Sequence, residues 1–207
     1  MDIQFHGANC LTINTKGVRL TIDDNLVDLG SKKITKAEDV VLYTSAHGEA
    51  PKDARLAIDQ PGEYEVGGVA IYGIAARAHI DEEGKKTATM YKIIFDDMSV
   101  LVTGHIYPNL SDAQLEAIGT VDALFVPVGG NGYTMDGIGA LKIVKEIEPK
   151  IVVPTHYQQD GLEFAVPQHS LEEAIKSLGM EAKETTDKLR LKSGILENST
   201  QLIVLKK

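Results

Sequence analysis

The chain has 207 residues, of which 43% are hydrophobic and 25% charged, and its formal net charge is −9. This length and composition are typical of a globular protein with a large core, and we expect a single domain over residues 1–207. The acidic balance argues against nucleic acid and anionic membranes as partners, because both require a basic surface. The single cysteine, Cys10, allows no internal disulfide and suits a reducing cytoplasm. We find no signal peptide and no apolar run of about 20 residues that could span a membrane.

The first half of the chain is predicted to consist of short strands. A turn signal at 14–17 separates two segments in which apolar and polar residues alternate, which is typical of a hairpin. The stretch 61–68 is rich in glycine and begins with proline, so we predict a loop there. Strands are predicted at 3–5, 11–13, 18–22, 40–43, 69–74, 90–95 and 100–102, and 56–58 is a short apolar run.

Helices enter in the second half. Ser111 with Gln114, and Ser170 with Glu173, have the spacing of capping boxes that open helices. Apolar residues at every third position predict an amphipathic helix over 136–147. Strands are predicted at 121–128, 151–154, 189–191 and 202–205. Many strands followed by mixed helix and strand predict an α/β fold, a sandwich of two sheets with helices outside.

Four of the six histidines follow predicted apolar strands: His47, His79, His105 and His156. Strand ends at one edge of a sheet converge, so we expect these four side chains to lie near one another. Imidazole is the commonest metal ligand in proteins, and the pattern therefore predicts a metal site. Each histidine taken alone is also compatible with a structural role, and His6 and His169 lack this context altogether.

The segment 40–50, V-V-L-Y-T-S-A-H-G-E-A, resembles the signature of the metallo-β-lactamase superfamily, an apolar strand followed by T-H-x-H-x-D-H. Further blocks at 61–68 (P-G-E-Y-E-V-G-G), 126–136 (V-P-V-G-G-N-G-Y-T-M-D) and 149–157 (P-K-I-V-V-P-T-H-Y) are similar to those of its L-ascorbate-6-phosphate-lactonase-like branch, the Zn-dependent hydrolases of the β-lactamase fold. The resemblance covers most of the chain. It implies a four-layer αββα sandwich with a metal site at one edge of the sheets.

The resemblance also implies which residues stand at the family's ligand positions. The first metal would use Ser45, His47 and His79, the second would use Glu49, Ala50 and His156, and His105 stands for the bridging aspartate.

These substitutions change what the site can hold. Ser45 is a weak donor, Ala50 donates nothing, and the single lone pair of His105 cannot bridge two ions as a carboxylate does. A two-metal clamp is therefore not expected. His47, His79, His105 and His156, with Glu49 in reserve, are enough donors for one ion. Asp23 matches the family's strand-end aspartate, which orients a ligand histidine, although a plain turn carboxylate is the alternative.

Two readings of the function follow. The first is a metal-dependent hydrolase with at most one ion, zinc before manganese or iron, acting on a small substrate such as a phosphorylated lactone or ester. An open coordination position would then hold a water with a pKa of about 7, and Glu49 is the candidate general base. The second is a catalytically inactive, metal-free protein that binds a small molecule or another protein. Formation of a homo-oligomer is compatible with both.

Two further features have alternative interpretations. The loop 129–132 (G-G-N-G) could bind a phosphate through its backbone N–H groups, or it is a turn that needs positive φ. Tyr133 and Tyr157 could point into the pocket or serve in packing.

Overall fold

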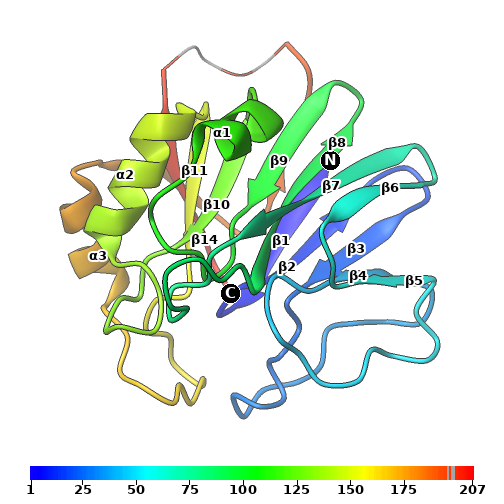
Figure 1. The fold of residues 1–207 in the computed structure, drawn as a ribbon, viewed down its shortest axis with the longest axis horizontal. Helices are drawn as coiled ribbons and strands as arrows, with labels where there is room; N and C mark the ends of the chain where they lie inside the picture. The colour runs from blue at the N-terminus through cyan, green and yellow to red at the C-terminus, as the bar shows by residue number, and fades with distance from the viewer. Residues whose placement is uncertain (195, 197–198) are drawn as a thin grey trace.

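The computed structural model describes residues 1–194, 196 and 199–207. Within this part of the chain, two β-sheets pack face to face and three helices cover one side of the pair (Figure 1). The arrangement confirms the predicted α/β class, a sandwich of two sheets with helices outside.

The six-stranded sheet starts with the predicted hairpin. Strands β1, β2 and β3 are antiparallel, and β4 and β5 continue the sheet in parallel. Along β1 buried residues such as Ile3 and Phe5 alternate with partly exposed ones, as in any half-buried strand. The strand order is β13 (Leu189–Arg190), β1 (Asp2–Gly7), β2 (Cys10–Asn14), β3 (Arg19–Ile22), β4 (Val40–Leu42) and β5 (Leu56–Ile58).

The eight-stranded sheet is parallel on one side and antiparallel on the other. Strands β9, β10, β11 and β14 are parallel, which explains their nearly continuous apolar runs, since both faces are covered. The strand order is β12 (Ala182–Thr186), β14 (Gln201–Leu205), β11 (Ile151–Thr155), β10 (Ala123–Pro127), β9 (Met98–Val102), β8 (Ala88–Phe95), β7 (Val69–Ala76) and β6 (Gly62–Val66).

Two edge strands of this sheet depart from the prediction. The stretch 61–68 is not all loop, because Gly62–Val66 forms β6 and pairs with β7. Exposed Glu63 and Glu65 alternate there with half-buried neighbours, a period of two that the flanking glycines and proline obscured. Strand β12 was not predicted, since its sequence A-K-E-T-T is polar and mostly exposed.

The helices are α1 (Asp112–Ile118), α2 (Gly137–Ile147) and α3 (Leu171–Leu178). Ser111 and Ser170 form the predicted capping boxes, and Asp136 caps α2 by accepting a 2.8 Å hydrogen bond from the Gly139 N–H. All three helices pack on the side of the eight-stranded sheet, where α1 contacts β7 and α2 contacts β10. In the described residues no helix has the length and apolar character that crossing a membrane requires.

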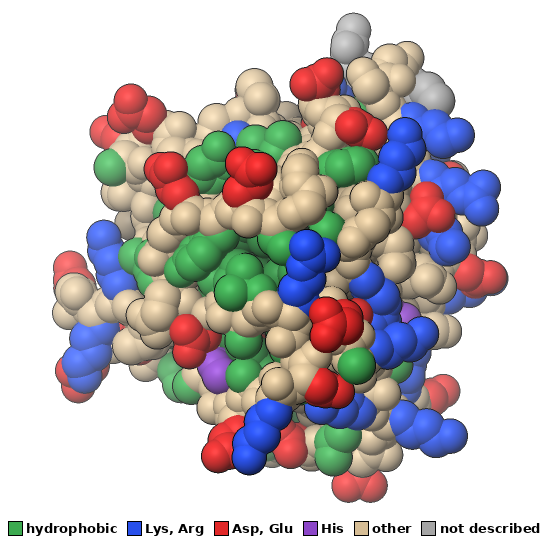
Figure 2. Space-filling model, turned by 90° about the vertical axis from the view of Figure 1, so that its right-hand side faces the viewer, with side chains coloured by type: hydrophobic (Ala, Val, Ile, Leu, Met, Phe, Trp, Pro, Cys, Tyr) green, Lys and Arg blue, Asp and Glu red, His purple; other side chains and the backbone are tan. Residues whose placement is uncertain are grey.

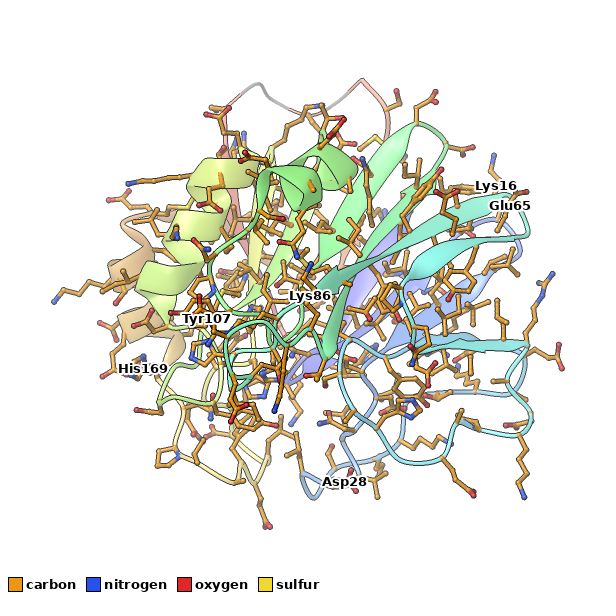
Figure 3. The ribbon with its side chains drawn as sticks, viewed as in Figure 1. Lys16, Asp28, Glu65, Lys86, Tyr107 and His169 are labelled. Carbon is orange, nitrogen blue, oxygen red and sulfur yellow. The ribbon has the colours of Figure 1, made fainter. Side chains whose placement is uncertain are left out.

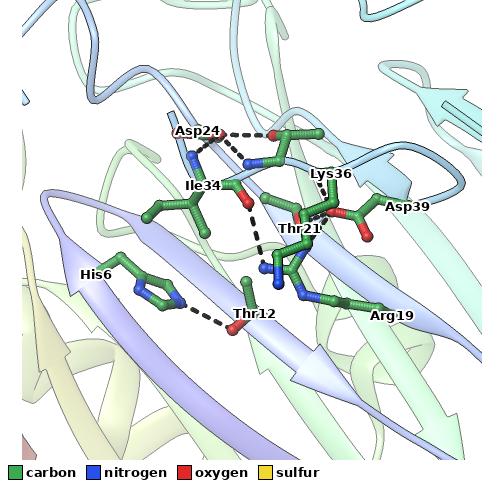
Figure 4. A network of polar contacts seen from close by, with 9 residues as sticks. His6, Thr12, Arg19, Thr21, Asp24, Ile34, Lys36 and Asp39 are labelled. Atoms are coloured by element: carbon green, nitrogen blue, oxygen red, sulfur yellow. Dashed lines mark hydrogen bonds and ion pairs between the residues drawn. The ribbon is translucent and has the colours of Figure 1, made fainter. Parts of the chain in front are cut away.

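Against the outer face of the six-stranded sheet lies the loop 23–39, and not a helix. A polar network ties it down (Figure 4). One Asp24 carboxylate oxygen accepts hydrogen bonds from the Ile34 N–H (2.8 Å) and from the Thr35 N–H and hydroxyl (2.6 Å each). Arg19 of β3 forms an ion pair with Asp39 and donates to the Ile34 carbonyl. Apolar residues of the loop, among them Leu26, complete a small second core with the start of β2.

The main core fills the space between the sheets. Tyr91 of β8 is fully buried there, and its hydroxyl donates to the carbonyls of Tyr43 and Ile58 on the opposite sheet (3.1 and 3.2 Å). At the side where β5 and β6 form the sheet edges, hydrophobic side chains reach the surface in a shallow hollow flanked by charged residues (Figure 2). Tyr72, 37% exposed, belongs to this side of the eight-stranded sheet.

Candidate functional site

The site lies where the strands of both sheets end. Strands β3 and β4 are parallel to each other, as are β9, β10 and β11, and the segments that follow them gather at the lower edge in Figure 1. A cavity of about 480 Å³ opens there, and residues from both sheets line it, including Asn9, Asp23, Tyr43, His105, Tyr133 and His156. Another cavity of about 520 Å³, lined by Lys150, Thr186 and Arg190, contains none of the predicted site residues.

His105 and His156 form a pair in this cavity. Their ring centroids are 4.4 Å apart and the rings meet edge to face at 82°. Burial lowers the pKa of His105 well below its usual value, and the neighbouring His156 lowers it further. Burial lowers the pKa of His156 to about 4. Both imidazoles are therefore neutral near pH 7 and keep the lone pair that a metal ligand needs.

Gln168 fixes which nitrogen of His156 carries the proton. The His156 Nδ1 lies 3.1 Å from the Gln168 Oε1, and the Gln168 Nε2 donates to the Val166 carbonyl at 2.9 Å. The Val166 contact turns the amide oxygen toward His156, and an amide oxygen can only accept, so Nδ1 carries the proton and the lone pair is on Nε2. This is how an outer partner prepares a ligand histidine.

Gly129 makes room for this contact. A Cβ at position 129 would lie 2.0 Å from the Gln168 Oε1 and 2.2 Å from the His156 carbonyl oxygen. Sequence reasoning missed Gln168 because nothing in the local pattern pairs it with a histidine twelve positions earlier. The local sequence also gives no sign that Gly129 lies close to His156.

His79 lies beside His105 without lining the cavity. Its backbone N–H donates to the His105 carbonyl at 2.7 Å, next to the bridge between Ala78 and Ile106. Burial lowers the pKa of its imidazole, and its Nδ1 is a buried atom with no hydrogen-bond partner. The fold thus anchors the backbone of a third neutral histidine next to the pair.

His47 and Glu49 lie at the exposed rim of the cavity. The His47 ring stacks on Tyr43 with 3.6 Å between centroids, its Nε2 lies 3.2 Å from the Asp59 Oδ2, and its Nδ1 contacts the Gly48 carbonyl. His47 is therefore directed toward Asp59.

Asp23 acts on the start of this rim segment. Its two oxygens accept hydrogen bonds from the Thr44 N–H (2.8 Å) and hydroxyl (2.5 Å). Burial raises the pKa of its carboxyl to about 6, although the Thr44 hydrogen bonds lower it in part. Gly104 lets Thr44 approach, since a Cβ there would lie 2.1 Å from the Thr44 hydroxyl. Asp23 thus holds the backbone just before Ser45, where the resemblance implies contact with a histidine.

The two tyrosines differ in their position relative to the cavity, and the glycine loop is a turn. Tyr133 lines the cavity and lies 4.9 Å from the His105 ring. Tyr157 is buried and packs on Phe5 with 5.9 Å between centroids. The loop 129–132 is a turn in which Gly130 has φ of 70° and donates its N–H to the Met135 carbonyl.

The donor set can be tested against a metal. Among the residues that the structure describes, no three histidine, cysteine or carboxylate side chains are close enough together to hold an ion. The family's two-metal centre does not fit, since Ser45 and Ala50 supply no equivalent donors. The chemistry of a single ion fits better, because His79 and His105 both have a buried Nδ1 without a partner. The four-histidine site stays a prediction.

Two packed sheets with a cavity at the strand ends that contains histidines define an α/β sandwich with its candidate site at one edge of the sheets. A family model described as "Beta-lactamase superfamily domain" matches residues 2–156. The chain belongs to the metallo-β-lactamase superfamily.

Curated proteins similar to this chain include metal-dependent hydrolases by name. The chain is 29% identical over 184 residues to a UPF0173 protein of Pyrococcus abyssi, covering 78% of this chain and 85% of that protein. It is 32% identical over 142 residues to a UPF0173 metal-dependent hydrolase of Pyrococcus horikoshii, covering 65% of this chain and 62% of that protein.

Solved structures show the same fold. A metallo-β-lactamase superfamily protein of Thermotoga maritima superposes with a TM-score of 0.75 at 23% identity, covering 99% of this chain and 98% of that one. The metallo-β-lactamase fold protein YhfI of Bacillus subtilis gives 0.62 at 12% identity, covering 99% and 96%. The branch within the superfamily stays a prediction.

Proposed function

We propose that this chain is a metal-dependent hydrolase of small molecules that uses a single ion, most simply zinc. His105 and His156 would be its main ligands, and His79 would become the third only when its side chain turns toward this pair, because no three described donors are within reach of one ion as they stand. His47 and Glu49 stay proposed as rim groups, with Glu49 as the general base. The observation that carries the proposal is the contact between two neutral histidines, half-buried His105 and buried His156, the second of which Gln168 orients. The name of the Pyrococcus horikoshii relative supports it.

Different residues of the chain would have different roles in such a site. The ion would supply Lewis-acid polarisation of the substrate and a water nucleophile at neutral pH. Gln168 keeps the His156 Nε2 free of a proton, and Asp23 holds the rim segment through Thr44. Glu49 is exposed at the rim, where it can exchange protons with water and substrate.

Metal content measured by plasma mass spectrometry on untagged protein tests the proposal. We expect about one equivalent in the wild type and its loss in His105→Ala. His6→Ala is the matched control, because His6 bonds to Thr12 outside the cavity and its removal should leave the metal bound. No metal in the wild type, even after reloading with Zn²⁺, Mn²⁺ or Fe²⁺, would contradict the proposal.

A second candidate is a metal-free protein that binds a small molecule in the same cavity. It is favoured by the absence, among the described side chains, of any group of three donors, and by the direction of His47 toward Asp59. The same measurement separates the two candidates.

A further inference from the structure

Among the charged groups that line the cavity, carboxyl groups predominate. Asp23, Asp24, Asp28 and Glu49 contribute four carboxyl groups, whereas Lys33 contributes the one ammonium among the described lining residues. Asp23, Asp24 and Asp28 come from the segment after β3, and Glu49 comes from the segment after β4, so all four carboxyl groups follow strands of the six-stranded sheet. A concave site lined by one sign of charge concentrates ligands of the opposite sign.

Lys33 is the one lysine or arginine side chain among the described residues that line the cavity, so positive groups are few there. A phosphorylated substrate would meet few positive groups here, although phosphate sites usually present several.

The fold holds two of the four carboxylates in place. Asp24 is fixed by the hydrogen bonds from Ile34 and Thr35 that close its loop (Figure 4), and Asp23 is fixed by Thr44. Asp28 is exposed, as is Glu49, so both can move to meet a ligand. Fixed groups inside and adaptable groups at the mouth are a usual arrangement of a binding site.

Aromatic faces accompany the carboxylates. Tyr133, 44% exposed, stands beside His105, whereas the His47 ring covers one face of Tyr43. Tyr43 and Tyr133 both line the cavity. The face of a tyrosine ring attracts an ammonium group, and acidic and aromatic groups together are the chemistry that recognises organic cations.

Asn9 adds an independent sign of a ligand. It lines the cavity and is only 4% exposed, and its Oδ1 accepts a 2.9 Å hydrogen bond from the Thr155 hydroxyl. Its Nδ2 is buried and has no partner. Buried donors are nearly always paired, and the Asn9 Nδ2 lacks an acceptor. An oxygen atom of a bound molecule would supply this acceptor.

We infer that the cavity binds a small organic cation, an amine or a quaternary ammonium, that also presents a carbonyl or hydroxyl oxygen. The cationic group lies among the carboxylates and the tyrosines, and the oxygen accepts from Asn9. This inference rests on the proposed function for its site and gives the substrate class. It replaces the phosphorylated lactone suggested by the resemblance with a positively charged ester, lactone or related compound.

Matched probes test the inference by calorimetric titration. Choline carries both features, 3,3-dimethyl-1-butanol replaces its ammonium by neutral carbon, and propyltrimethylammonium replaces its hydroxyl by methyl. We expect choline to bind at least about fivefold more tightly than either analogue. Its affinity should fall as salt rises, and glycerol phosphate should bind more weakly still.

Charge variants locate the binding. The double variant Asp28→Asn/Glu49→Gln should weaken choline severalfold and leave 3,3-dimethyl-1-butanol unchanged. Glu65→Gln is the matched control, because exposed Glu65 lies on β6 near Lys16, far from Asp28 (Figure 3). This control should bind choline as the wild type does.

Several results would overturn the inference: no choline binding, equal affinity for choline and 3,3-dimethyl-1-butanol, tighter binding of glycerol phosphate, or no effect of the double variant. Titrations are run on protein of measured metal content, with and without added Zn²⁺. Choline selectivity in a protein that binds no metal would leave the inference standing while the hydrolase proposal fails. Bound metal without choline selectivity would leave the hydrolase proposal standing while the inference fails.

Discussion

The two walls of the cavity are built differently. On the side of the eight-stranded sheet, the rings of His105 and His156 are in contact, and Gln168 and the backbone of His79 are fixed around them. On the side of the six-stranded sheet, the segment after β4 is mostly exposed, and His47 turns to Asp59. The wall of the eight-stranded sheet is therefore packed around its histidines, whereas the segment after β4 on the other wall is held at its start by Asp23 and is otherwise largely exposed.

Alanine substitutions at two glycines, one on each wall, should show this difference in packing most strongly. Gly129→Ala should destabilise the protein by about 2 kcal/mol, because its Cβ would enter the space of Gln168 and of the His156 backbone. Gly48→Ala on the other wall should change the stability little, since no atom lies within 4 Å of its added Cβ. Urea denaturation measures both. Equal effects would mean that the walls are equally packed.

The pH dependence of stability should differ between the walls. The pKa of His156 is lowered to about 4 in the folded state, from 6.5 unfolded. The unfolded state therefore binds more protons, and the stability from this group is present above pH 6.5 and lost as pH falls toward 4. Between pH 7 and 5 this loss is about 2 kcal/mol. In chelator-treated protein, the stability gap between the wild type and His156→Gln should shift by this amount, and a constant gap would contradict the burial of a neutral His156.

Asp23 on the other wall should have the opposite slope. Its pKa is raised to about 6 from 3.8, so the stability from its protonated form is fully present below 3.8 and lost as pH rises through 6. From pH 5 to pH 7.5 the wild type should lose about 1 kcal/mol relative to Asp23→Asn. Thermal unfolding at the two pH values measures this. An unchanged difference would show that Asp23 is ionised in both states.

The smallest effect is expected at the rim. Asp59→Asn removes the partner of His47, but the Asp59 side chain is 50% exposed. Exposed ion pairs contribute at most about 1 kcal/mol, so the unfolding midpoint should scarcely change. Nitrogen NMR should show that the His47 ring changes and that the His105 and His156 rings do not. Changes in the signals of all three rings would contradict this expectation, because they would show that the two walls respond together.

Local patterns were enough to predict much of the fold. Alternation identified β1 and β2, and the serine capping boxes identified α1 and α3, because these signals depend on near neighbours in the sequence. Strand β6 was hidden by its glycines, and β12 by its polar, exposed sequence. Edge strands depend on pairing with a distant neighbour, and such pairing leaves a weak local signal.

The site was predictable only as far as backbone topology determines it. Strand ends place His105 and His156 in one cavity, as their positions in the sequence suggested. The link of His156 to Gln168, the contact of His47 with Asp59 and the unpartnered Nδ2 of Asn9 depend on side-chain rotamers and long-range packing. A linear pattern contains no record of these contacts.

The most direct test of the account compares His105→Ala with His47→Ala in their affinity for Zn²⁺, by competition with a chelator. The account predicts that His105→Ala abolishes binding, whereas His47→Ala keeps most of it, because the packed wall supplies the main ligands. Equal loss in both variants, or a wild type that binds no Zn²⁺, would contradict it.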